Sequence, residues 1–140
     1  MQRYKIGFIG TGRMGSALIR GFLNSGLVSK NNIIAADSDI KKLNKLKKDT
    51  GIRITLRNTD LVKNSDIVFI AVEPKAIASV LDEIKKFADK KLIVSIAAGV
   101  STKFIEKRLN NARVIRIMPN APAAVNQMAS GYCLGKKATR

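Results

Sequence analysis

The sequence predicts a protein of the α/β class, with a doubly wound, mainly parallel sheet and helices on both faces. Short apolar runs alternate with segments in which apolar residues recur every three or four positions, which indicates strands that alternate with amphipathic helices. Parallel strands need a crossover connection, and a helix is the usual one. A glycine-rich turn follows the first apolar run directly, as is typical of such sheets.

In the first half of the chain, strands and helices are expected to alternate from the start. Apolar and aromatic residues before Gly10 indicate a buried strand closed by a turn, and a helical pattern follows until Gly26 stops it. A second apolar run ends at Asp37 and leads into a Lys-rich amphipathic helix. A weak strand and a helical turn complete this half, so that the expected elements lie in order at residues 4–9, 14–23, 33–36, 40–47, 52–56 and 58–60.

The second half contains the clearest strand of the sequence. A largely apolar run from Asp66 to Val72 is ended by Pro74, and a helix with one apolar face follows it. Ser101 stands where the N-cap of the next helix is expected. The expected strands and helices lie in order at residues 66–72, 77–87, 92–97, 101–109 and 114–118.

The composition excludes several kinds of chemistry. The chain has 26 Lys and Arg against 10 Asp and Glu, a net charge of +16, and no histidine, so catalysis by a histidine base is excluded. Cys133 is the single cysteine, which excludes a disulfide within the chain and leaves zinc or haem almost no ligands. No apolar run approaches the roughly 20 residues that span a bilayer, and no secretory signal is visible. We therefore expect a cytoplasmic protein with no membrane partner.

The turn at residues 10–15 matches the pattern G-x-G-x-x-G between a predicted strand and a predicted helix. In this context the glycines allow a tight turn, close approach of the backbone to a pyrophosphate, and close packing of the helix on the strand. The N–H groups that begin the helix attract anions, and one arginine adds charge. The pattern predicts a Rossmann-type domain that binds NAD(P), with a purely steric turn as the alternative. The expected cofactor-binding residues here are Gly10, Thr11, Gly12, Arg13, Met14 and Gly15.

A carboxylate ends the second predicted strand. Asp37 lies 22 positions after Gly15, close to the spacing at which an acidic residue accepts hydrogen bonds from the adenosine ribose. Its charge disfavours the 2′-phosphate of NADPH, so NADH is favoured as cofactor, while Ser38 and the nearby Lys41 and Lys42 can offset that repulsion. The alternative is that the segment Asp37-Ser38-Asp39 only caps the next helix, and both roles can coexist.

Three further segments follow predicted strands and are expected to line the same crevice, because ligands of such sheets bind beyond the carboxyl ends of the strands. The small residues among them leave room for a ring, and Asn120, between two prolines, can contact a nicotinamide carboxamide or a substrate. Each segment can alternatively be a plain turn. The expected cofactor-binding residues are Ala71, Val72, Glu73, Pro74, Ala98 and Asn120.

Four motifs resemble, in order and spacing, the cofactor domain of pyrroline-5-carboxylate reductase: residues 6–15, 66–74, 94–100 and 116–122. The resemblance spans nearly the whole chain. It implies NAD(P)H-dependent reduction of 1-pyrroline-5-carboxylate to proline, the last step of proline biosynthesis, with Asn58 added to the cofactor or active-site positions. A protonated imine accepts hydride directly, so the reaction implied by the resemblance needs no general base. No catalytic residue is identified in this chain.

Three features depart from the family pattern. Glu73 replaces the usual lysine, with Lys75 available to compensate, and Asp37 stands where NADP-using members often have a small polar residue. Members continue as a helical domain that dimerises and holds the cyclic imino-acid substrate, whereas this sequence stops at Arg140. We therefore expect residues 1–125 to form the NAD(P)-binding domain, residues 126–140 to be a last strand or a frayed end, and the full-length family to form homo-oligomers.

Other functions compete with this interpretation. The chain could be a non-catalytic dinucleotide-binding module or a truncated relative, or a different two-domain dehydrogenase, because the glycine turn does not discriminate substrates. The net charge of +16 raises nucleic acid as a partner. However, five lysines between Lys41 and Lys48 interleave with leucines at helical spacing, which indicates the solvated face of an amphipathic helix. Aromatic residues are only 5% of the chain, so we expect no nucleic-acid partner.

Overall fold

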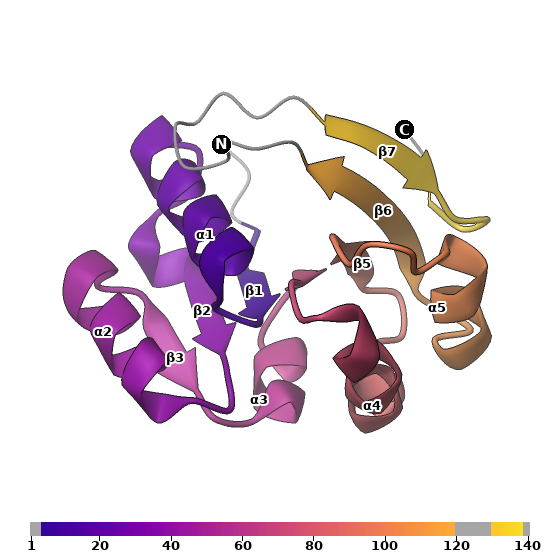
Figure 1. Ribbon diagram of the computed structural model, residues 1–140, viewed down its shortest axis with the longest axis horizontal. Helices are drawn as coiled ribbons and strands as arrows, with labels where there is room; N and C mark the ends of the chain where they lie inside the picture. The colour runs from indigo at the N-terminus through magenta and orange to yellow at the C-terminus, as the bar shows by residue number, and fades with distance from the viewer. Residues whose placement is uncertain (1–3, 120–129, 139–140) are drawn as a thin grey trace.

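The computed structural model describes residues 4–119 and 130–138, which form one seven-stranded sheet covered by helices on both faces (Figure 1). The strands are β1 (Ile6–Ile9), β2 (Ile33–Ala36), β3 (Arg53–Thr55), β4 (Ile67–Ile70), β5 (Leu92–Ser95), β6 (Arg113–Pro119) and β7 (Ser130–Leu134). The helices are α1 (Arg13–Ser25), α2 (Ile40–Thr50), α3 (Asn58–Lys63), α4 (Pro74–Ile84) and α5 (Thr102–Arg108), with two 3₁₀ turns at Lys30–Asn32 and Lys85–Phe87.

The strand order is β3-β2-β1-β4-β5-β6-β7, and the first six strands are parallel. Consecutive strands are added outward from β1 on one side and from β4 on the other, so the direction of winding reverses between these two strands. Their carboxyl ends meet at that point, which is where sheets of this type bind ligands. β7 runs antiparallel to β6 along the outer edge (Figure 1). The predicted doubly wound, mainly parallel sheet is confirmed.

Each face of the sheet buries its own hydrophobic cluster. On one face α1 and α2 cover Phe8 and Phe69, whose rings stack with centroids 4.9 Å apart, and Phe22 of α1 meets the Phe69 ring edge-on at 5.6 Å. On the other face α3, α4 and α5 cover the sheet, and Ile77 and Leu81 of α4 are fully buried. Both faces of the central strands are therefore apolar, which explains why these strands read as continuous apolar runs.

The helix ends follow local chemistry. Gly26 and Gly51 end α1 and α2 with φ angles of 75° and 79°, a conformation that favours glycine. The side chain of Ser101 caps α5, as predicted, by accepting a hydrogen bond from the Phe104 N–H. The prediction placed the start of the fourth helix too late, because α4 begins at Pro74, where proline suits the first helical position.

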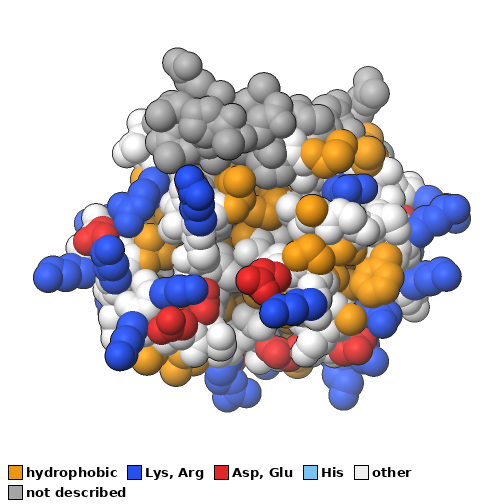
Figure 2. Space-filling view, viewed as in Figure 1, with side chains coloured by type: hydrophobic (Ala, Val, Ile, Leu, Met, Phe, Trp, Pro, Cys, Tyr) orange, Lys and Arg blue, Asp and Glu red, His pale blue; other side chains and the backbone are white. Residues whose placement is uncertain are grey.

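The charged surface is dispersed. The five lysines of α2 are exposed, whereas Leu43 and Leu46 of the same helix are buried, as the amphipathic pattern predicted. Lys and Arg side chains are scattered over the face shown in Figure 2, at its edges and beside acidic side chains nearer its centre, with hydrophobic side chains exposed between them. Within residues 4–119 and 130–138, no helix has the length and apolar character needed to cross a membrane. The same residues contain no group of three acidic, Cys or His side chains placed to hold a metal ion.

Candidate functional site

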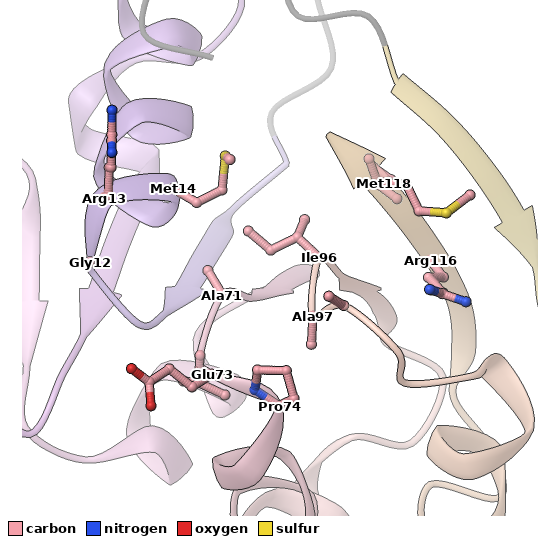
Figure 3. Close-up of a pocket in the computed structure, with 13 residues that line it drawn as sticks. Gly12, Arg13, Met14, Ala71, Glu73, Pro74, Ile96, Ala97, Arg116 and Met118 are labelled. Carbon is pink, nitrogen blue, oxygen red and sulfur yellow. The ribbon is translucent and has the colours of Figure 1, made fainter. Parts of the chain in front are cut away.

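A cavity of about 540 Å³ lies at the carboxyl ends of the central strands, between the start of α1 and the end of β6 (Figure 3). This volume lies within the range of small-molecule and cofactor sites. Figure 3 shows Met14, Ile96 and Met118 around the same open space, and the Arg13 side chain extending along α1 away from Pro74. The lining residues are Gly12, Arg13, Met14, Ala71, Val72, Glu73, Pro74, Ile96, Ala97, Ala98, Arg116, Ile117 and Met118.

Two glycines of the turn are required by the fold itself. Gly10 has a φ of +99°, and a Cβ at this position would lie 2.5 Å from the Ala71 carbonyl oxygen. A Cβ on Gly15 would lie 2.2 Å from the Gly10 carbonyl oxygen, closer than real Cβ contacts allow. The Gly10 N–H also donates to the Ala36 carbonyl at 2.8 Å. These contacts hold the turn between β1, β2 and β4.

Gly12 differs from both neighbours. It is the N-cap of α1 with a φ of −68°, which any residue adopts, and a Cβ there would meet no atom within 4 Å. No side chain caps this 13-residue helix among the described residues. The first N–H groups of the helix therefore have no side-chain acceptor, and the residues that carry them begin at the cavity lining, where an anion can accept from such groups. The space that a Cβ would fill fits the close approach of a pyrophosphate, so the turn fits a dinucleotide.

Asp37, at the end of β2, is bound to the glycine turn. Its Oδ2 accepts hydrogen bonds from the Thr11 N–H and the Thr11 hydroxyl, both at 2.8 Å, and its Oδ1 accepts one from the Asp39 N–H at 2.9 Å. Burial raises the pKa of Asp37, but the hydrogen bonds from Asp39 and Thr11 and the charge of Lys42 outweigh it and lower the pKa below 3.8. The carboxylate is therefore charged at neutral pH.

The capping role belongs to a different carboxylate. Asp39, not Asp37, is the N-cap of α2, and its Oδ1 accepts hydrogen bonds from the Lys41 and Lys42 N–H groups at 3.0 and 3.4 Å. Among the described residues, the only hydrogen bond between the Asp37 side chain and this turn is the one that its Oδ1 accepts from the Asp39 N–H. The segment 37–39 therefore does cap α2, but through Asp39, and this capping does not exclude a cofactor role for Asp37.

Six predicted site residues of the described chain are not part of the cavity lining: Gly10, Thr11, Gly15, Asp37, Ser38 and Asn58. Ser38 is exposed next to Asp37, and Asn58 is the half-buried first residue of α3. Asn120 lies outside the described residues. The cavity thus brings together residues 12–14 of the glycine turn, residues 71–74 and Ala98, while the cofactor contacts of all the predicted site residues stay predictions.

The β6 side of the cavity contains a charged residue that the sequence reading did not select as a site residue. Arg116 lines the cavity, and its Nε is buried with no hydrogen-bond partner among the described residues. The available signal was a lone charged residue inside the apolar run Val114 to Met118. Met118 lies further along the same strand and is 46% exposed.

Glu73 is the negative charge of the lining. Its Oε2 lies 3.4 Å from the Lys75 Nζ, so the compensation expected from Lys75 is present as an ion pair. Both side chains are more than two-thirds exposed, and exposed pairs of this kind contribute little stability. The pair therefore reduces the local negative charge without fixing the shape of the cavity.

Comparisons with known proteins agree with this geometry. The chain is 44% identical over 141 residues to a pyrroline-5-carboxylate reductase of Methanosarcina acetivorans and 34% identical over 139 residues to one of Arabidopsis thaliana. Each match covers 99% of this chain, but only 52% and 50% of the relative. The chain therefore spans about half the length of the curated relatives it matches.

Solved structures give the same result. A pyrroline-5-carboxylate reductase from Coxiella burnetii superposes with a TM-score of 0.94 at 32% identity, and one from Plasmodium falciparum, solved with NADP bound, with 0.88 at 31%. They match 99% of this chain and 52% and 51% of theirs. The resemblance that the four motifs indicated is confirmed. Residues 5–99 match the family described as "NADP oxidoreductase coenzyme F420-dependent", and the chain belongs to that family.

Proposed function

We propose that this chain is the nicotinamide dinucleotide-binding part of a pyrroline-5-carboxylate reductase, which reduces 1-pyrroline-5-carboxylate to proline with NAD(P)H. The observation that carries the proposal is the open space at Gly12, on the cavity side of the α1 N-terminus. Nothing in the described fold requires glycine there, whereas a bound pyrophosphate does. The similarity to reductases of this substrate supports the choice of reaction.

The described residues can bind and orient such a cofactor. The N–H groups at the start of α1 would hold the pyrophosphate, and Arg13 would add positive charge. Ala71, Ala97 and Ala98 leave room for the nicotinamide ring at the carboxyl ends of β4 and β5. The bound nicotinamide supplies the hydride, and the surrounding apolar side chains keep water from the reacting carbon.

The proposal includes a preference for NADH over NADPH. It is supported by the charged carboxylate of Asp37, which repels a 2′-phosphate, and opposed in part by Lys41 and Lys42 at the start of α2. Ser38 is retained as a contact on the adenosine side, Asn58 as a cofactor or active-site contact, and Asn120 as a contact of the nicotinamide or the substrate. Their tests are alanine substitutions measured by cofactor affinity.

The remaining parts of the proposal concern the setting of the domain. We keep residues 1–125 as the NAD(P)-binding domain and residues 126–140 as its end, a last strand or a frayed tail, whose described residues 130–138 include β7. The proposed enzyme forms homo-oligomers, acts on a cyclic imino acid, binds no nucleic acid and is cytoplasmic.

The test is a fluorescence titration of the 140-residue chain with NADH and with NADPH, each at about 50 and 200 mM salt. We expect saturable binding of both, tighter for NADH, that changes by less than about tenfold between the two salts. Nucleic-acid binding through many phosphate contacts falls by about 10³-fold or more over the same range. Absence of saturable binding of either dinucleotide would contradict the proposal. Binding without proline formation, even with a reductase substrate domain supplied, would favour the non-catalytic module.

A further inference from the structure

The carboxylate of Asp37 joins two segments that are distant along the chain. Thr11 and Asp37 are 26 residues apart, and two hydrogen bonds of 2.8 Å connect Thr11 to the Oδ2 atom. Thr11 is 6% exposed and occupies the second position of the glycine turn, between Gly10 and Gly12. The contact therefore acts on the backbone that leads into the α1 N-terminus.

The Thr11 N–H depends on this acceptor. A buried backbone donor that loses its partner keeps its desolvation cost, so the turn would have to shift to reach water or another acceptor. Gly10 on one side, with its φ of +99°, already fixes the direction of the chain. Any shift would consequently move the backbone at Gly12, where the cofactor is proposed to approach.

The acceptor count limits what else Asp37 can do. A carboxylate offers about four acceptor positions. Thr11 occupies two on Oδ2, and the Asp39 N–H occupies one on Oδ1. About one position is left for a ribose hydroxyl, so most of the bonding capacity of this carboxylate is used within the chain.

We propose that Asp37 is a positioning residue that braces the glycine turn through Thr11, and that this brace strengthens the binding of NADH and NADPH alike. The ligand in this inference rests on the proposed function, whereas the brace exists in the chain alone. Selection between the two cofactors by charge is then a second and separate effect of the same carboxylate.

The first experiment replaces Thr11 in the 140-residue chain. Thr11→Val keeps the size of the side chain, the Thr11 N–H and the charge of Asp37, and removes only the hydroxyl bond. We expect the affinities for NADH and NADPH to fall by about the same factor, on the order of tenfold, with their ratio unchanged. Thr11→Ser restores the hydroxyl and should recover affinity to within about threefold. Wild-type affinity of Thr11→Val for both dinucleotides would overturn the inference.

The second experiment replaces the carboxylate. In Asp37→Asn the amide has one acceptor oxygen, so either Thr11 or the Asp39 N–H faces the NH₂ group instead. We expect weaker NADH binding, and we expect adding Thr11→Val to this variant to cause little further loss, because both changes break the same contact. A double variant that loses affinity by the full product of the single losses would contradict the brace.

Asp39→Asn is the matched control. It removes the same charge two residues away, keeps an N-cap oxygen for Lys41, and makes no contact with Thr11. Its NADH affinity should stay within about threefold of wild type. A loss as large as that of Asp37→Asn would show that charge alone, not the contact with the turn, explains the effect.

Hydrogen exchange of the Thr11 amide tests the brace without any ligand. Exchange should be slow in wild type and in Asp39→Asn, and at least about tenfold faster in Asp37→Ala, which leaves no side-chain acceptor, while amides of β1 and β4 stay protected. Equal exchange at Thr11 in wild type and Asp37→Ala would refute the brace. This measurement needs no dinucleotide. A wild-type chain that binds neither cofactor would refute the proposed function, whereas the exchange rate of the Thr11 amide would still test the brace.

Discussion

The two sides of the cavity are held in different ways. On the glycine-turn side, hydrogen bonds within the described chain hold Gly10 to Ala36 and Thr11 to Asp37, and the Gly10 carbonyl leaves no room for a Cβ at Gly15. On the β6 side, the Arg116 Nε is buried without a partner among the described residues, and Met118 is 46% exposed. The first side is organised before any ligand arrives, whereas the second still has bonding capacity to offer.

This difference between the two sides matches the ligand groups that each is proposed to bind. A pyrophosphate needs fixed N–H groups, and the turn supplies them from one short segment braced against three strands. The reacting ring needs apolar walls that close around two molecules, cofactor and substrate. The β6 side, which is proposed to contact both molecules, can therefore keep polar groups without partners in the described chain and the sheet still folds.

Among substitutions on the two sides of the cavity, the largest loss of folding stability is expected at Gly15. A Cβ there would lie 2.2 Å from the Gly10 carbonyl oxygen, which is backbone and cannot move aside cheaply. Gly15→Ala should lower the free energy of unfolding by about 3 kcal/mol or more, measured by urea denaturation. Gly12→Ala, in the same turn but with no atom within 4 Å of its Cβ, is the matched control and should stay within about 1 kcal/mol of wild type. Equal stability of the two variants would contradict the close packing.

Gly12 should show the opposite behaviour to Gly15. Its φ of −68° and open surroundings allow alanine, so Gly12→Ala should leave the free energy of unfolding unchanged or raise it by about 0.4–1 kcal/mol. Its affinity for NADH should nevertheless fall by at least about tenfold, because the methyl group occupies the space of the phosphate. Unfolding and NADH titration on the same preparation check both halves. Wild-type affinity of Gly12→Ala for NADH would contradict the assignment of the phosphate site to Gly12.

Sequence patterns predicted most of the glycine-turn side and little of the β6 side. Apolar runs reveal buried strands because burial is a property of each position, and the turn is specified by glycines that stand next to each other. The bond between Thr11 and Asp37 was not predicted, because it depends on the register of β1 and β2 and not on a local pattern. The pattern assigned the three glycines different roles, and the structure adds the contacts: a Cβ at Gly10 or Gly15 would meet backbone atoms, whereas a Cβ at Gly12 would meet open space.

The same reasoning explains the smaller differences. Pro74 was interpreted as the end of a strand, although its fixed φ equally suits the first residue of α4. Arg116 was treated as part of a motif because no rule of spacing tells which face of β6 a side chain uses. Side-chain partners across strands are decided by tertiary contacts, which a single sequence does not contain.

Acid should weaken the glycine-turn side selectively. The pKa of Asp37 is lowered in the fold, so its contribution to stability is fully present above the unfolded-state pKa and is lost as the pH falls through the folded-state value. At pH 7 we expect Asp37→Asn to be less stable by about 1 kcal/mol, and the difference to vanish below the folded-state pKa. Urea denaturation at several pH values measures this. A difference that persists unchanged in strong acid would contradict the charge dependence.

The β6 side should tolerate the loss of its charge. Arg116→Met removes a donor whose Nε is buried without a described partner, and it keeps an apolar stem of similar length. The free energy of unfolding of the 140-residue chain should stay the same or rise, by up to about 1 kcal/mol. Arg113→Met, on the same strand but exposed, is the control and should change it by less than about 0.5 kcal/mol. A loss above about 1 kcal/mol for Arg116→Met would mean that the β6 side is as tightly bonded as the glycine turn.

The smallest effect is expected at Glu73, which lines the cavity between the two sides. Glu73→Gln removes an exposed negative charge that is paired with Lys75, so the stability should change by less than about 0.5 kcal/mol. NADH affinity should rise by about two- to threefold at low salt, since the ligand is an anion, and the gain should shrink as salt screens it. Glu83→Gln makes the same charge change on the exposed side of α4, outside the cavity, and should leave affinity unchanged. An equal gain in both variants would assign the effect to net charge, whereas a gain confined to Glu73→Gln places the phosphates beside the β4 end of the cavity.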